Sequence, residues 1–152
     1  MGTISLNRGG FLQGAVGGSV SDAGNATSSQ NVFDNNTSAQ ANAIQYFKSS
    51  GRGGGTFRFT RTFLHFDTSG VSGGSNFVLN VPGTTNAEAN VVGIKHTAGS
   101  SNGSAIVSND FDNLVRGTVY FSSTSWSTGS NAISLAAAAA NDIINNNDFN
   151  IC

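Results

Sequence analysis

The segment Thr56–Asp67, Thr-Phe-Arg-Phe-Thr-Arg-Thr-Phe-Leu-His-Phe-Asp, constrains the fold more than any other part of the chain. It is filled with aromatic and β-branched residues, which fit the pleated surface of a sheet. A run of this length without Gly, Pro or Asn predicts one long β-strand. The fold must therefore provide a sheet on which this strand can pair.

The order of the apolar residues in this strand raises a question about its two faces. Side chains alternate between the faces of a strand, so Phe57 and Phe59 share one face, whereas Leu64 and Phe66 share the other. One buried face cannot hold all four in a single register. We therefore expect a bulge near residues 61–63, which would bring both pairs to the same side, with Phe66 in the core.

Shorter strands are predicted along the rest of the chain, each bounded by Gly, Ser, Asn or the single proline. The expected strands lie at residues 41–48, 76–81, 90–97, 104–108, 118–122, 131–135 and 148–152. Only 10% of the residues are charged, against about 25% in an average domain, and nearly half are Gly, Ser, Thr or Asn. This composition and this spacing predict an all-β, antiparallel β-sandwich.

One segment departs from the β pattern. Residues 136–140 are five consecutive alanines within the segment 135–145, and alanine is the best helix former. We expect one short Ala-rich helix there, near the C-terminus, anchored to the sandwich by Leu135, Ile143 and Ile144.

The 152 residues suit one domain. Residues 1–40 are loosely patterned, with short apolar groups between Gly-, Ser- and Asn-rich stretches, and residues 41–152 carry the expected sandwich. Two interpretations of residues 1–40 stay open. They supply the first strands of the sandwich, or they form an arm that docks on another protein.

Charge and cysteine content exclude several classes of function. The net charge is -1 and the seven Lys and Arg are scattered, which argues against nucleic acid as a partner. No run approaches the roughly 18 apolar residues that span a bilayer, so no membrane partner is expected. Cys152 is the only cysteine, so the chain has no disulfide and no thiolate metal site of its own.

Arg61-Thr-Phe-Leu-His-Phe-Asp67, followed by Thr-Ser-Gly-Val71, resembles a motif of known domains. It is similar to the signature of carbohydrate-binding-module-like jelly-roll sandwiches of the DNRLRE type, as found in virion proteins of marine bacteriophages. Three later segments agree in order with the phage versions: residues 108–112, 125–127 and 131–135. The resemblance covers about residues 41–152.

This resemblance implies a jelly-roll-like sandwich and a virion role. We expect a non-enzymatic structural protein that decorates the outer capsid surface and is located in the virion. Its partners would be phage capsid protein or other virion proteins. The alternative is a tail-fibre, receptor-binding or carbohydrate-binding module whose partner is a host surface glycan. Because one fold hosts many functions, this step is an analogy.

Few residues of the chain are suited to metal binding or acid–base catalysis. His65 and His96 lack a second ligand at metal-site spacing, so we expect packed or rim histidines, with His65 on the solvent side. Asp67 precedes a Thr-Ser-Gly turn whose backbone N–H groups its carboxylate can accept. Asp110 and Asp112 flank Phe111, and calcium ligation by this pair is the alternative to a polar strand edge.

Trp126 is the candidate glycan contact. Sugar sites favour amphipathic Trp and Tyr, whereas the 11 phenylalanines of this chain are core aromatics. The alternative is that Trp126 is a structural plug. No nucleophile elbow, phosphate loop or acid pair is present in the sequence. We therefore expect no enzyme activity, no catalytic residue, no cofactor and no metal.

Overall fold

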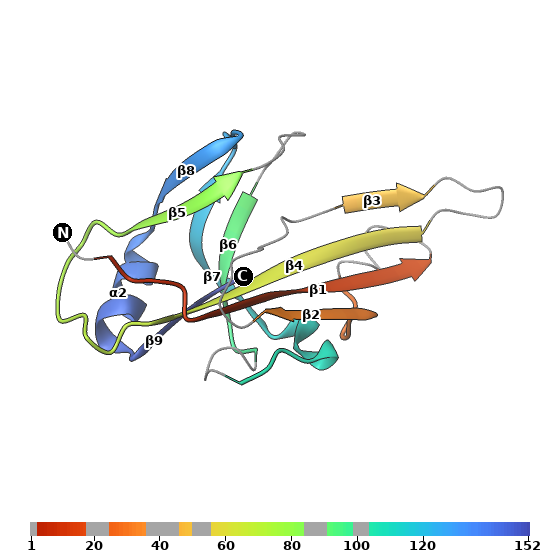
Figure 1. Ribbon diagram of the computed structural model, residues 1–152, viewed down its shortest axis with the longest axis horizontal. Helices are drawn as coiled ribbons and strands as arrows, with labels where there is room; N and C mark the ends of the chain where they lie inside the picture. The colour runs from red at the N-terminus through yellow and green to blue at the C-terminus, as the bar shows by residue number, and fades with distance from the viewer. Residues whose placement is uncertain (1–2, 18–24, 36–45, 50–55, 84–90, 99–103) are drawn as a thin grey trace.

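A computed structural model describes residues 3–17, 25–35, 46–49, 56–83, 91–98 and 104–152 (Figure 1). Strands dominate it, and they form two antiparallel sheets with one short helix near the C-terminus. The predicted all-β sandwich is thus confirmed. In Figure 1 the strands at residues 8–17 and 56–67 run side by side along the molecule, and the smaller sheet lies above one end of them.

Seven strands form the large sheet, in the order β2-β1-β4-β9-β6-β7, with β3 also paired to β4. Their bounds are β1 Arg8–Gly17, β2 Asn31–Asn35, β3 Tyr46–Ser49, β4 Thr56–Asp67, β6 Val91–His96, β7 Leu114–Ser123 and β9 Asp148–Ile151. The small sheet consists of β5 (Val78–Gly83) and β8 (Gly129–Ser134). Residues 1–40 contribute β1 and β2, both within the large sheet.

The predicted bulge in β4 is wrong. β4 pairs with β1 at ten consecutive positions, from Arg8 opposite His65 to Gly17 opposite Thr56, without a shift. No bulge is needed because both faces of β4 are covered. Phe63 belongs to one buried cluster, whereas Leu64 and Phe66 pack against another.

The first cluster lies on the face of Phe63 and is completed by residues far along the chain. Its buried members are Leu12, Phe63, Ala98, Ile106 and Phe111. The last two belong to the segment 104–112, which was predicted to begin as a strand at 104–108. Instead, a 3-10 helix, η2 (Ser108–Asp112), follows an irregular stretch. The carboxylate of Asp110 stabilises this turn, since it accepts the backbone N–H of Val107 and the amide of Asn113.

The second cluster fills the space between the large sheet, the small sheet and the helix α2 (Ala137–Asn145). Its buried members are Tyr120, Ala139, Ile143, Phe149 and Ile151. The predicted Ala-rich helix is confirmed, and Leu135 and Ile143 pack in this cluster as expected. A polar contact also fastens α2, because Asp142 accepts hydrogen bonds from Lys95 on β6 and Tyr120 on β7.

The prediction that His65 faces solvent is wrong. Its face of β4 is the face of Phe63, on which the first cluster packs, and only 2% of the residue is exposed. Phe66 packs against the second cluster and is partly buried. Adjacent residues of β4 are therefore both inside, which a strand covered on one face would not allow.

Candidate functional site

An open hollow of about 460 Å³ lies where β7 and β8 approach each other, and Trp126 lines it. Its wall also contains Asn131, Ala132 and Ile133. Six serines complete the lining: Ser122, Ser123, Ser125, Ser127, Ser130 and Ser134. The wall thus offers hydroxyl groups, one amide, one indole and a small apolar patch, and none of its described residues has an ionisable side chain.

The connection between β7 and β8 carries Trp126 into this wall. The Ser123 hydroxyl donates to the Ser125 carbonyl at 3.1 Å and accepts the Ser125 N–H at 3.3 Å, so the chain turns directly after β7. β8 begins at Gly129, whose φ of 102° favours glycine. Trp126 lies between these two turns.

Asn131 holds the same connection from the small sheet. The residue is 8% exposed. Its Oδ1 accepts the Ser127 N–H at 2.9 Å and the Ser127 hydroxyl at 3.2 Å. Its Nδ2 donates to the Ser127 carbonyl at 3.0 Å and to the Val81 carbonyl at 3.3 Å. Sequence reasoning treated Asn131 only as a strand residue, because this contact forms across a turn and between two strands.

The hollow has the chemistry of a site for a neutral polar ligand. Serine hydroxyls both donate and accept hydrogen bonds, and the indole supplies apolar area. Binding sites combine such apolar walls with a few convergent polar groups. The structure therefore places Trp126, the predicted glycan contact, in the wall of this hollow.

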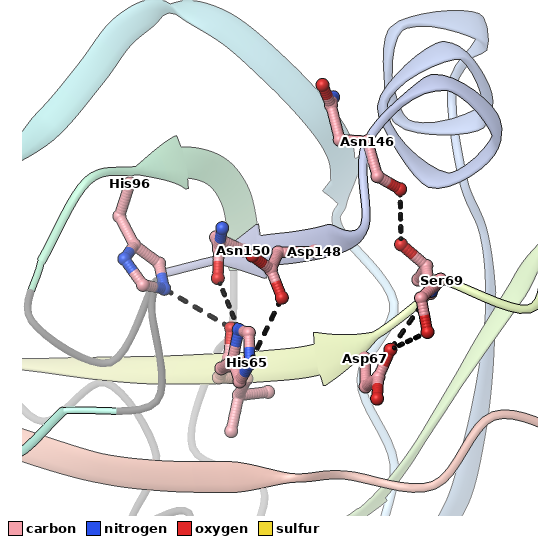
Figure 2. Close-up of polar contacts among 9 residues, drawn as sticks. His65, Asp67, Ser69, His96, Asn146, Asp148 and Asn150 are labelled. Carbon is pink, nitrogen blue, oxygen red and sulfur yellow. Dashed lines mark hydrogen bonds and ion pairs between the residues drawn. The ribbon is translucent and has the colours of Figure 1, made fainter.

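A second polar cluster joins β4 to β9 (Figure 2). The Nδ1 of His65 lies 2.8 Å from the Asn150 Oδ1, and its Nε2 lies 3.5 Å from the Asp148 Oδ1. Directly after β4, the Thr68 hydroxyl donates to the Asn146 carbonyl at 2.9 Å. These contacts join β9 to β4, so the role of His65 is structural.

His96 packs in the core beside the first cluster. Its Nε2 donates to the Leu64 carbonyl at 3.2 Å, its Nδ1 accepts the Ala98 N–H at 3.2 Å, and its ring meets the Phe63 ring edge-on at 5.1 Å. Burial lowers the pKa of His96 from 6.5 to about 4. At neutral pH the ring is therefore uncharged, and both nitrogens are engaged inside the protein.

The acidic residues singled out from the sequence have separate partners. Ser69 donates both its hydroxyl, at 2.7 Å, and its backbone N–H, at 3.0 Å, to Asp67, and these hydrogen bonds lower the pKa of that carboxyl. Asp110 is buried and stabilises η2, whereas Asp112 pairs with Arg61 and Arg116. Asp110 and Asp112 therefore do not aim at one shared point, as a calcium site would require.

No family model, curated protein or solved structure matches the chain. Within the described ranges, no three His, Cys, Asp or Glu residues come close enough together to hold a metal ion. In the same part of the chain, no helix is long and apolar enough to cross a membrane. The site must therefore be judged from its own geometry.

Proposed function

We propose that the chain is a non-enzymatic structural protein of a phage virion and decorates the outer surface of the capsid. The segment that resembles phage virion proteins, Arg61 to Val71, covers the end of β4 and the turn after it. This segment supplies core, salt-bridge and turn contacts of the sandwich. The proposal rests on that resemblance together with the way in which the ionisable groups are used.

The observation that carries the proposal is that, among the residues that the structure describes, both histidines and Asp142 form internal contacts. His65 contacts Asn150 and Asp148, and His96 contacts backbone on two sides. Asp142 accepts hydrogen bonds from three neighbours. A general acid or base needs access to a substrate proton, and these groups are instead occupied in fastening strands and helix. This use of the ionisable groups supports a role that depends on the protein surface rather than on reaction chemistry.

Part of that surface is apolar. β2 lies at the edge of the large sheet, and its Phe33 is 47% exposed and its Val32 42% exposed. The Phe33 ring stacks on Phe11 of β1 with centroids 4.3 Å apart. Exposed aromatic and aliphatic side chains that lie together are typical of protein contact surfaces. We propose this edge as the contact with capsid protein.

The test is to locate the protein in virions of the phage that encodes it, by cryo-EM or by antibody labelling. Labelling spread over the head is the expected result, and absence from the particle or labelling confined to the tail would refute capsid decoration. Phe33→Ser should reduce rebinding to stripped capsids at a temperature well below its Tm, which loss of the stacking on Phe11 lowers slightly. The exposed Ser28→Ala is a matched control from the loop before β2.

A second candidate function is a receptor-binding or carbohydrate-binding module of the virion. The hollow beside Trp126 favours it, because this wall combines an indole with serine hydroxyls. A glycan array with Trp126→Ala as the control tests it. Binding that disappears in the variant would support this function, and an array without any specific signal would refute it.

A further inference from the structure

We propose that Asn131 and Gly83 preform the hollow beside Trp126, and that this hollow selects uncharged over acidic glycans. The proposal deepens the second candidate function and rests on it. Asn131 would act as a positioning residue, since it holds the Ser127 backbone next to Trp126. The side chain of Asn131 makes four hydrogen bonds within the protein, all of 2.9–3.3 Å.

The side-chain amide of Asn131 holds the residue after Trp126, and we call this set of contacts the Asn131 clamp. Its side-chain amide contacts both the N–H and the C=O of Ser127, the residue after Trp126. The same amide reaches the Val81 carbonyl on β5. An exposed connection is thereby tied at one residue to the backbone of a two-stranded sheet. A side chain that makes four hydrogen bonds and is 8% exposed has one conformation available.

Gly83 has no side chain, and the Trp126 connection occupies the space that a side chain would need. A Cβ atom at this position would lie 2.2 Å from the Ser127 carbonyl oxygen and 2.9 Å from the Trp126 Nε1. The Ser127 carbonyl belongs to the backbone, so it cannot rotate away from a Cβ atom as a side chain could. Only glycine allows β5 to approach the Trp126 connection this closely. Asn131 on β8 therefore holds Ser127, and Gly83 on β5 leaves room for Ser127 and Trp126.

The side chains that line the hollow favour an uncharged ligand. Within the part of the chain that the structure describes, the wall of the hollow consists of serines, one tryptophan, one asparagine and two apolar residues, without Lys, Arg, His, Asp or Glu. Recognition of a carboxylate-bearing or sulfated sugar normally uses charge-assisted hydrogen bonds from Arg or Lys. Hydroxyl groups and an indole suit an uncharged hexose instead. A preformed wall also lowers the entropy lost on binding.

The experiment uses Trp126 as its own reporter, because it is the only tryptophan of the chain. Acrylamide quenching of its fluorescence should increase in Asn131→Ala and in Gly83→Ala while the far-UV CD spectrum stays that of the wild type. Asn131→Asp is the second variant, since it keeps the shape and loses the Nδ2 donor. Asn80→Ala, an exposed asparagine on β5, is the matched control and should leave quenching unchanged.

Binding is then measured on arrays of neutral and sialylated oligosaccharides. We expect the full chain to bind neutral members only, Trp126→Ala to lose them, and Asn131→Ala to bind them about tenfold more weakly, which equals about 1.4 kcal/mol. Unchanged quenching in all Asn131 and Gly83 variants would overturn the positioning role. Equal binding of neutral and sialylated glycans would overturn the selectivity. Failure of the wild type to bind any glycan, with quenching changed as expected, would overturn the carbohydrate-binding function itself.

Discussion

His96 should make the protein lose stability in weak acid. In the folded state burial holds the pKa of His96 at about 4, whereas the unfolded value is 6.5. The unfolded chain therefore binds the proton first as the pH falls. Stability from this residue is complete above pH 6.5, declines between pH 6.5 and about 4, and is lost below that range. At 1.36 kcal/mol for each pKa unit, the full loss is about 3 kcal/mol.

Urea unfolding followed by CD at pH 7.0, 5.5 and 4.0 measures this loss. The comparison protein is His96→Gln, which cannot titrate and can still form hydrogen bonds to Leu64 or Ala98. Asp67 and Asp142 also have lowered pKa values and also lose stability in acid, but both proteins contain them, so their effect cancels. The free-energy difference between wild type and variant should shrink by about 3 kcal/mol from pH 7 to pH 4. A difference that stays constant would refute the reasoning.

Four further predictions follow from packing and contacts. Gly93→Ala places a Cβ 2.3 Å from the Phe121 ring and should cost about 1–3 kcal/mol in urea unfolding; Gly117→Ala, with open space around it, is the silent control. His65→Ala should cost about 1–3 kcal/mol because it removes an almost fully buried side chain together with its contacts to Asn150 and Asp148, and a neutral effect would show that these contacts do not stabilise the fold. Deleting residues 2–12 removes half of β1 and should yield aggregated protein on size-exclusion chromatography; a folded monomer would identify a dispensable arm. Excess EDTA should leave the Tm unchanged, and a fall of more than about 4 °C would reveal a structural metal.

Local sequence patterns predicted β4 to β9 and the helix, whereas the strand expected at 104–108 is an irregular stretch followed by η2. β4 was predictable because its aromatic and β-branched residues favour extended backbone wherever they lie. Strands β5 to β9 were each predicted to within a few residues, because Gly, Ser, Asn and Pro mark their ends. The helix α2 followed from its alanines, whose propensity needs no distant partner.

The tertiary structure alone decided what covers each face and which polar groups meet. His65 was predicted to be exposed, and β4 to be bulged, because alternation says which side chains share a face and does not say how many faces are covered. The face of β4 that carries Phe63 and His65 is covered by Ile106 and Phe111, which lie more than forty residues after them in the chain. Likewise, Trp126 could be selected from its chemistry, but the Asn131 contact that positions its neighbour forms only when β5, β8 and the preceding turn come together. Propensity acts over a few residues, whereas burial and hydrogen-bond pairing depend on segments that only folding brings together.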